Sequence, residues 1–357
     1  MMLRALQLAE EGLYSTSPNP RVGCVLVRDE KIIGEGFHRK AGEAHAEIIA
    51  LQAANGQARG ATAYVSLEPC AHQGRTGPCA EALIKAGVSR VVFAMEDPNP
   101  LVAGNGLQML RDAGIDISGP LMEESARQLN PGFIKRMNSG LPWVRCKLAM
   151  SLDGRTAMAD GKSQWITGSA ARADVQKFRA RSCAIITGVD TVIHDDPKLN
   201  VRLPDIERQP LRVIVDSKLR TPPQSTIFTL GEKVILAHTQ ESVSENRAKE
   251  FSNANLLVCP QKNDKVDLRS LLQTLVKEQQ VNEVLVEAGA KLCGGFLAAG
   301  LVDEIIVYMT SKLMGRDARP LFDISITSMA GQLALSIQDI RAVGGDWRIT
   351  AIPDPEG

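Results

Sequence analysis

The sequence lacks an excess of charge of either sign, because its 357 residues carry 41 Lys and Arg against 41 Asp and Glu. A nucleic-acid-binding protein needs clustered basic side chains against phosphates, and no half of this chain is basic. The sequence also lacks any run of about 18 to 20 apolar residues, the length that a membrane span requires. We therefore expect neither a nucleic acid nor a membrane as a partner.

A secretion signal is also missing from the sequence. Residues 1–14 form an amphipathic pattern that contains Glu10 and Glu11, and no apolar core with a small-residue cleavage site follows. The seven cysteines are odd in number and widely scattered, which is typical of metal ligands or buried thiols in a reducing compartment. We expect the protein to reside in the cytoplasm.

Length and composition indicate two globular domains of ordinary polarity, with 44% hydrophobic and 23% charged residues. In the first third, strand-like and helix-like patterns alternate, which predicts a mixed sheet with helices on its faces. The predicted helices are 2–11, 44–54, 78–86 and 106–113, and the predicted strands are 22–27, 31–37, 63–67 and 91–95.

The predicted domain boundary lies in the polar, glycine- and proline-containing stretch 138–142. It follows a predicted helix, 123–137, and precedes a strand, 143–150, so the domains are expected at 1–141 and 142–357. Later strands alternate with helices, which makes the second domain α/β as well. These strands are predicted at 184–187, 211–216, 233–237, 255–258, 281–287 and 304–309, and no element is predicted beyond Phe322.

Three potential zinc ligands stand close to Pro residues or helix starts in the first domain: His45, Cys70 and Cys79. Zinc binds thiolates and imidazoles in a tetrahedron, and three protein ligands leave the fourth position to water, as in catalytic sites. Water on zinc is acidic enough to ionise near neutral pH. Glu47, two residues after His45, provides a nearby carboxylate that can shuttle protons without binding the metal.

This pattern, His-x-Glu followed by Pro-Cys and a second Cys, is typical of zinc nucleobase deaminases. The eight residues between Cys70 and Cys79 exceed the usual two. One alternative is a chance His-x-Glu with two buried thiols. Another is a structural zinc clip in a nucleotide-sensing protein, for which His72 is the nearest fourth ligand.

Several segments of the first domain resemble the deaminase domain of the RibD family of bifunctional riboflavin biosynthesis enzymes. These segments are 17–23, 36–38, 45–47, 67–79 and 97–104. The resemblance implies a cytidine-deaminase-like three-layer α/β/α fold, one Zn²⁺, and hydrolytic deamination of 2,5-diamino-6-ribosylamino-4(3H)-pyrimidinone 5′-phosphate with Glu47 as the catalytic residue. Asn19 and His38 are equally compatible with substrate contacts and with structural roles.

In the second domain, a glycine-containing segment, 287–295, follows a predicted strand and precedes an apolar helix. Bare backbone at a helix N-terminus is a typical phosphate-binding arrangement. The segment does not match the Gly-x-Gly-x-x-Gly fingerprint of dinucleotide-binding folds, so a glycine-rich turn without a ligand is the alternative.

The segments 147–156, 163–167 and 191–199 resemble the reductase domain of the same family. This resemblance implies an α/β fold related to dihydrofolate reductase and NADPH-dependent reduction of the ribosyl group of 5-amino-6-(5-phosphoribosylamino)uracil. It also implies a homodimer or a higher homo-oligomer. The implied NADPH-binding residues are Ala149, Trp165, Thr191, Asp195, Ser217, Gly289, Ala290, Lys291, Leu292, Cys293, Gly294 and Gly295. The implied substrate-binding residues are Lys147, Ser163, Arg179, Leu199, Arg202 and Glu287.

Other readings remain for single residues and for the whole chain. Trp165 can be a core residue, Asp195 a turn cap and Arg179 part of a solvated helix face. A zinc deaminase acting on tRNA or another polynucleotide is a second function, which the balanced charge disfavours. The family resemblance favours a phosphorylated pyrimidine as the substrate, with both arginines binding its phosphate.

Overall fold

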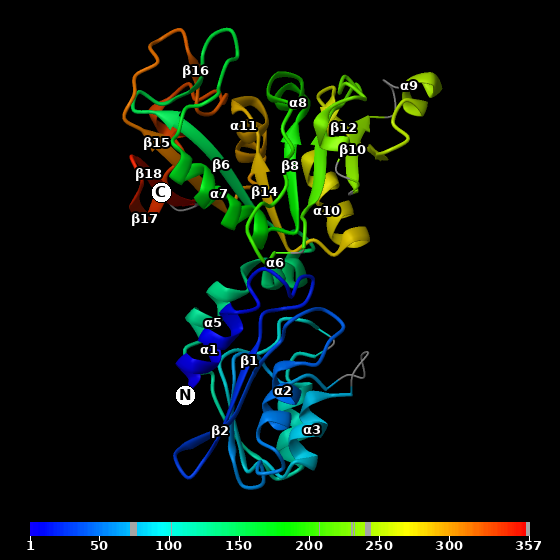
Figure 1. Cartoon of the computed structure of the whole chain (residues 1–357), viewed down its shortest axis with the longest axis vertical. Coiled ribbons are helices and arrows are strands. Elements are labelled where there is room, and N and C mark those ends of the chain that lie inside the picture. Colours follow the sequence, from blue (N-terminus) through cyan, green and yellow to red (C-terminus); the bar gives the residue numbers. More distant parts are fainter. Residues whose placement is uncertain are drawn as a thin grey trace. The chain divides into compact units, whose positions relative to one another are not determined.

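The computed structural model describes residues 1–71, 77–100, 102–206, 208–229, 231, 233–239 and 244–354. The chain divides into two compact units, Met1–Gly140 and Leu141–Gly357. Figure 1 shows a separate sheet in each unit. In the described part of the chain, none of the helices combines the length and apolar character needed to cross a membrane.

The first unit is built on a five-stranded mixed sheet with the order β2-β1-β3-β4-β5. β1 pairs antiparallel with β2 and β3, whereas β3, β4 and β5 run parallel. The strands are β1 (Gly23–Arg28), β2 (Lys31–Phe37), β3 (Thr62–Val65), β4 (Arg90–Phe93) and β5 (Asp116–Ser118). The helices are α1 (Met2–Glu10), α2 (Ala46–Ala53), α3 (Cys79–Lys85), α4 (Asn105–Asp112), α5 (Glu123–Leu129) and α6 (Pro131–Ser139).

Helices cover both faces of this sheet and give it three layers. On one face, α2, α3 and α4 pack through small or aliphatic residues such as Ala50, Leu83 and Leu110. On the other face, α1 and α5 pack against Val25 of β1. The residues on either side of Val25, Cys24 and Leu26, point to the first face. Because successive strand side chains alternate between faces, both sides of β1 are apolar. The three-layer α/β/α architecture expected from the family resemblance is confirmed.

The predicted helix 123–137 is wrong, because two helices occupy this region. α5 ends at Leu129 and α6 begins at Pro131. Proline has no N–H group and its ring clashes with the carbonyl four residues earlier, so it ends the first helix and suits the first position of the second. Asn130, between them, adopts a non-helical backbone and hydrogen-bonds the main chain of Arg21.

The second unit is built on a nine-stranded sheet with the order β11-β10-β9-β8-β14-β6-β15-β18-β17. The strands from β11 through β15 run parallel, and β18 and β17 add an antiparallel hairpin at the edge. The strands of this sheet are β6 (Trp143–Ser151), β8 (Ala184–Gly188), β9 (Leu211–Val215), β10 (Val234–Thr239), β11 (Asn255–Cys259), β14 (Glu283–Glu287), β15 (Glu304–Thr310), β17 (Leu335–Val343) and β18 (Asp346–Pro353).

Helices again cover both faces of the sheet (Figure 1). α10 and α11 pack on one face and α7 on the other, which explains why the central strands are apolar on both sides. The helices are α7 (Ser169–Arg181), α8 (Val189–Asp195), α9 (Glu245–Lys249), α10 (Leu268–Gln279) and α11 (Ala290–Ala298). Short 3₁₀ turns and two-stranded pairs complete the unit: Thr226–Phe228, Met329–Gly331, β7 (Arg155–Ala157) with β16 (Arg319–Pro320), and β12 (Gln261–Lys262) with β13 (Lys265–Val266).

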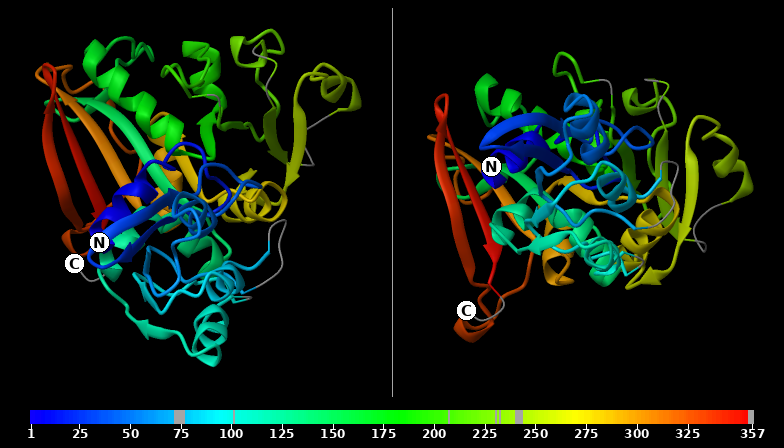
Figure 2. Two further views of the ribbon diagram at one scale, coloured as in Figure 1. Left: turned by 60° about the horizontal axis from the view of Figure 1, so that its bottom comes forward. Right: turned by 90° about the horizontal axis from the view of Figure 1, so that it is seen from below.

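The edge hairpin β17–β18 is an element that the sequence-based expectation omitted beyond Phe322. It forms the outer edge of the sheet, as the two further views show (Figure 2). In β17, Leu335, Ile337 and Ile340 are exposed rather than buried. A β-bulge between Ile337 and Asp339 also breaks the two-residue alternation that identifies a strand in a sequence.

We expect Leu285→Ala to destabilise the second unit strongly. Leu285 lies in the central strand β14 and is completely buried, so the truncation leaves a cavity that costs about 2–5 kcal/mol of unfolding free energy. All three tryptophans, Trp143, Trp165 and Trp347, belong to this unit. Tryptophan fluorescence during urea unfolding therefore reports on it alone.

The matched control is Leu333→Ala, which truncates a half-exposed leucine in the same unit. We expect it to leave the urea midpoint close to that of the unsubstituted protein. Equal midpoints for Leu285→Ala and Leu333→Ala would show that β14 is not part of the stabilising core.

Candidate functional site

His45, Cys70 and Cys79 lie together, although 34 positions separate the first from the last in sequence. His45 is the N-cap of α2, Cys70 lies in the segment after β3, and Cys79 is the first residue of α3. The Nδ1 atom of His45 is 3.2 Å from Sγ of Cys79 and 3.6 Å from Sγ of Cys70. The potential ligand atoms of all three residues lie within 4.8 Å of one another.

These donors fit a zinc ion. Zinc–sulfur and zinc–nitrogen bonds of about 2.3 and 2.0 Å place tetrahedral ligands about 3.5 to 3.8 Å apart, close to the separations between these atoms. Among the residues that the structure describes, the group has three members. His72, the alternative fourth ligand, lies outside the described residues. Two sulfurs and one nitrogen suit zinc better than calcium or magnesium, which prefer oxygen.

The electrostatics of the cluster also favour a cation. A hydrogen bond from the Cys79 thiol, reinforced by the His45 ring, lowers the pKa of Cys70 to about 4. The same bond and burial raise the pKa of Cys79 above its usual value, and the bond with Cys70 raises the pKa of His45. The Cys70 thiolate thus favours the protonated forms of Cys79 and His45. A bound cation would take the place of those protons.

Glu47 lies in the first turn of α2, buried beside the three ligands. Burial and then the negative charge of Cys70 raise its pKa to about 7, whereas a hydrogen bond with Cys79 acts in the opposite direction. The carboxyl group therefore faces the sulfur ligands without being a member of the metal-binding group. A positive charge at the ligands would favour its ionised form.

A second histidine borders the cluster. The ring of His38 lies edge-on to the ring of His45, with 5.3 Å between their centroids. Its Nδ1 is 3.1 Å from the carbonyl of Ala44, which can only accept, so Nε2 accepts the hydrogen bond from the Asn19 side chain at 3.0 Å. Burial lowers the pKa of His38 and so favours the neutral form of this ring beside the ligand cluster.

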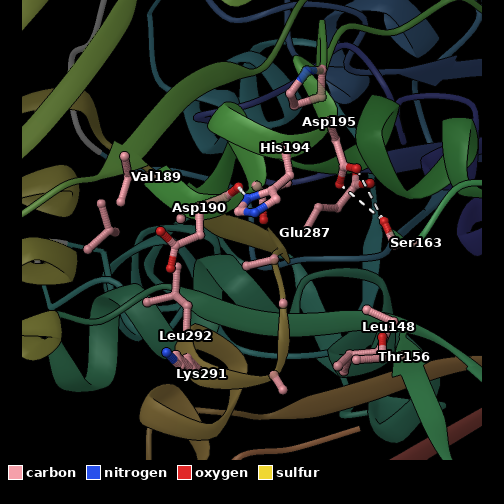
Figure 3. Close-up of a pocket in the computed structure, with 18 of the residues that line it drawn as sticks. Leu148, Thr156, Ser163, Val189, Asp190, His194, Asp195, Glu287, Lys291 and Leu292 are labelled. Carbon is pink, nitrogen blue, oxygen red and sulfur yellow. Dashed lines mark hydrogen bonds between the residues drawn. The ribbon is translucent and has the colours of Figure 1, made fainter. Parts of the chain in front are cut away.

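The second unit contains a pocket of about 1540 Å³ at the carboxyl ends of its parallel strands. This edge is where open α/β sheets bind ligands, because loops and helix N-termini converge there. The last residues of β8, β9 and β14 contribute to it, together with α8 and the first turn of α11. Figure 3 shows Ser163 and Asp195 pointing toward each other on one side of the pocket, with Lys291 and Leu292 on another.

Most residues that the family resemblance implies as ligand-binding line this pocket. They are Lys147, Ala149, Ser163, Trp165, Arg179, Thr191, Asp195, Leu199, Arg202, Ser217, Glu287, Gly289, Ala290, Lys291, Leu292 and Gly295. Cys293 and Gly294 do not line it. Cys293 is completely buried in the core, and a side chain on Gly294 would come within 2.6 Å of the carbonyl of Asp323.

Arg179 and Glu287 form a largely buried ion pair in the lining of the pocket. Nε and Nη2 of Arg179 donate to the two carboxylate oxygens at 2.6 and 3.0 Å, and Nη1 donates to the carbonyl of Asn200 at 3.1 Å. Burial alone would raise the pKa of Glu287, but the Arg179 charge lowers it overall. Burial lowers the pKa of the nearby Lys147.

This ion pair limits what Arg179 can do. Three of its five N–H groups are already used, so two remain for a ligand. Arg202, by contrast, is exposed, and within the described part of the chain its guanidinium hydrogen-bonds Asn200 at 3.0 Å. Both arginines thus keep N–H donors for an anion, Arg202 more of them than Arg179, and their binding of the substrate phosphate stays a prediction.

The segment 163–167 lines another side of the pocket. Ser163 donates to Asp195 at 3.2 Å, so this aspartate links two walls rather than only capping a turn. Trp165 is 65% exposed and therefore is not a core residue. The guanidinium of Arg172 lies 4.5 Å from the centroid of its ring and donates to the carbonyl of Thr167. No sequence pattern pointed to Arg172, which lies in the polar helix α7.

Comparisons with known proteins match the two parts of the chain, each with its own site, to two different family models. Residues 1–95 match the cytidine and deoxycytidylate deaminase zinc-binding region, and residues 142–349 match the RibD C-terminal domain. The riboflavin biosynthesis protein RibD of Escherichia coli is 49% identical over 97% of this chain and 96% of its own length. The RibD of Haemophilus influenzae is 48% identical over 99% and 96%, respectively.

Solved structures show the same fold. Acinetobacter baumannii RibD superimposes with a TM-score of 0.92 at 50% identity, covering 99% of this chain and 98% of that one. A diaminohydroxyphosphoribosylaminopyrimidine deaminase/5-amino-6-(5-phosphoribosylamino)uracil reductase from Thermotoga maritima superimposes with a TM-score of 0.88 at 31% identity, covering 99% and 97%.

We expect Cys79→Ser to abolish stable zinc binding, because a serine hydroxyl is a much poorer zinc ligand than a thiolate. Metal analysis after dialysis should find one zinc per chain in the unsubstituted protein and almost none in the variant. Cys183→Ser, in the second unit, is the matched control and should retain its zinc. Full zinc content in Cys79→Ser would remove this residue from the metal site.

Proposed function

Because this chain belongs to the RibD family and is thus a bifunctional deaminase and reductase of riboflavin biosynthesis, we propose the substrates of both reactions and the residues that act on them. Residues 1–141 form the deaminase domain and residues 142–357 the reductase domain. The first substrate is 2,5-diamino-6-ribosylamino-4(3H)-pyrimidinone 5′-phosphate. The second is its deaminated product, 5-amino-6-(5-phosphoribosylamino)uracil.

One observation carries the proposal for the deaminase: a buried carboxylate, Glu47, faces three converging zinc ligands. Zinc held by His45, Cys70 and Cys79 supplies a Lewis acid that makes water a nucleophile near neutral pH. Glu47 takes a proton from the attacking water and delivers protons to the ring nitrogen and to the departing amino group. Water and the amino-pyrimidine thus yield the carbonyl product and ammonia, with no net change in protons.

The pocket of the second unit supports the proposal for the reductase. When bound there, NADPH would supply a hydride to C1′ of the ribosyl group and become NADP⁺. The oxygen released as the C1′–O bond of the ring breaks would take a proton, which leaves a ribityl chain. The N-terminus of α11, at Gly289 and Ala290, presents main-chain N–H groups suited to the pyrophosphate. Ala149, Trp165, Thr191, Asp195, Ser217 and residues Lys291, Leu292 and Gly295 line the remainder of the cofactor site.

On the substrate side, the charged residues have separate roles. Arg202 binds the 5′-phosphate, and Arg179 orients Glu287 through their paired hydrogen bonds. Lys147 directs its ammonium group toward the reacting ribose, whose oxygen gains negative charge as the ring opens. Ser163 and Leu199 complete this part of the wall.

We propose that the protein acts in the cytoplasm as a homodimer or higher homo-oligomer. None of the seven cysteines, all within the described part of the chain, forms a disulfide, and two of them are proposed metal ligands; both features suit a reducing compartment. On one face of the edge hairpin, Leu335, Ile337, Ile340 and Trp347 are exposed. An apolar edge strand with unpaired main-chain groups is a typical site for a second copy of the chain.

The direct test supplies the purified protein with zinc and the diaminopyrimidinone phosphate, and then adds NADPH. We expect ammonia release in the first stage and NADPH oxidation in the second, because only the deaminated product suits the reductase. Ammonia release without later NADPH oxidation would contradict the assignment of the second domain.

Glu47→Gln separates catalysis from metal binding. A carboxamide cannot accept and return the proton, so we expect ammonia release to fall by at least 10²-fold, the contribution typical of a general base. Zinc content and NADPH oxidation with the deaminated substrate should not change. Unaltered deamination would exclude Glu47 from the mechanism, and a zinc-free variant would indicate a structural role.

The oligomer is tested by Ile337→Lys combined with Ile340→Lys, measured by light scattering after gel filtration. Charge on the apolar face should convert the oligomer to a monomer, since like charges would meet in a symmetric interface. Leu313→Lys changes an exposed leucine outside the hairpin and should leave the mass unchanged. A monomeric unsubstituted protein, or an oligomeric double variant, would contradict the proposal.

A further inference from the structure

Glu68 is a buried carboxylate two residues before the zinc ligand Cys70, and the proposed reactions do not use it. Its side chain is 3% exposed. Four main-chain N–H groups donate to it. Oε2 accepts from Asp97 at 3.2 Å and Gly104 at 3.0 Å, and Oε1 accepts from Gly106 at 3.0 Å and Leu107 at 3.3 Å.

These donors belong to the start of α4 and to the loop before it. Gly106 and Leu107 lie in the first turn of α4, whose N–H groups have no partners within the helix. A negative charge there is also stabilised by the helix dipole. Glu68 therefore hydrogen-bonds two separate parts of the loop between β4 and α4, at Asp97 and at Gly104. This loop contains the segment 97–104, which resembles the RibD family.

The same contact fixes the main chain that leads to Cys70. A side-chain carbon on Gly106 would lie 1.8 Å from the carbonyl oxygen of Pro69. Only glycine permits α4 to pack directly on Pro69. Beyond this point, the carbonyl of Cys70 accepts from the N–H of Ala80 at 3.2 Å, and its sulfur accepts from the N–H of Cys79 at 3.4 Å.

Cys70 is thus held from both sides. The start of α3 holds it on the side toward Cys79, and Glu68 with the start of α4 holds it on the side toward β3. We infer that Glu68 is a positioning residue, which acts on the metal through Cys70 by fixing the Pro69–Cys70 main chain. This inference rests on the proposed zinc chemistry and adds to it a residue outside the ligand set.

The chemistry explains why a carboxylate is needed. Two carboxylate oxygens accept all four hydrogen bonds, whereas a carboxamide offers one oxygen and turns an N–H₂ group toward two N–H donors. Glu68→Gln therefore breaks two bonds without changing the size of the side chain. Loss of a residue that orients a metal ligand typically weakens metal binding about 10- to 100-fold.

The experiment measures zinc release from the zinc-loaded full-length protein into a chromogenic chelator. We expect the apparent zinc affinity to fall about 10- to 100-fold in Glu68→Gln. Glu96→Gln is the matched control, because Glu96 is exposed in the adjoining segment, and it should release zinc like the unsubstituted protein. NADPH oxidation by the second domain shows that each preparation is otherwise intact.

Calorimetry separates positioning from general stability. Zinc raises the melting temperature of the first unit by an amount that depends on its affinity. A purely structural role would lower the melting temperature of the zinc-free and zinc-loaded forms equally, whereas we expect Glu68→Gln to reduce the increase that zinc causes. Gly106→Ala places a carbon 1.8 Å from the carbonyl oxygen of Pro69 and 3.2 Å from Oε1 of Glu68. It therefore disturbs the same packing contact from the α4 side and should reduce the increase too.

The outcomes are distinct. Equal zinc release and an equal zinc-induced shift in Glu68→Gln and Glu96→Gln would overturn the inference, even if the variant is less stable. If Glu68→Gln does not fold, an unreduced zinc-induced shift in Gly106→Ala would overturn it. Failure of the unsubstituted protein to bind zinc would instead contradict the proposed function.

Discussion

The metal centre depends on the packing of α2 and α3 on one face of the five-stranded sheet. Each helix contributes its ligand at its N-terminal end, as N-cap His45 and first residue Cys79. The helices pack closely over the same strands because several of their buried residues are small, among them Ala46 and Ala50 in α2 and Ala80 in α3. Larger residues would separate the two helix starts and, with them, the imidazole and the sulfur.

A common geometrical principle arranges the second site. The carboxyl ends of neighbouring parallel strands meet at one edge of a sheet, so residues far apart in sequence line one pocket there. Glu287 ends β14 and meets Arg179 from the covering helix α7, and Lys147 extends from the adjacent strand β6. The ion pair uses part of the hydrogen-bonding capacity of Arg179 and leaves it with fewer donors for a ligand than Arg202 has.

Several features of the fold followed from local patterns. The β-branched runs and turns placed β1, β2 and most parallel strands within a few residues of their observed ends. The errors have physical causes. Pro131 divides a continuous helical pattern into α5 and α6, and the edge strand β17 lacks a buried face and contains a bulge. An exposed strand has no alternation for a sequence pattern to detect.

The sequence by itself determined the zinc donor set, the nearby carboxylate and the family, because the types of these side chains and their order suffice to limit the chemistry. Tertiary structure alone decided which groups meet. Cys293 and Gly294 turn into the core because a helix exposes only part of its circumference. Glu68 receives four N–H groups from residues about 30 to 40 positions away, and no local pattern encodes a contact formed only when distant segments pack.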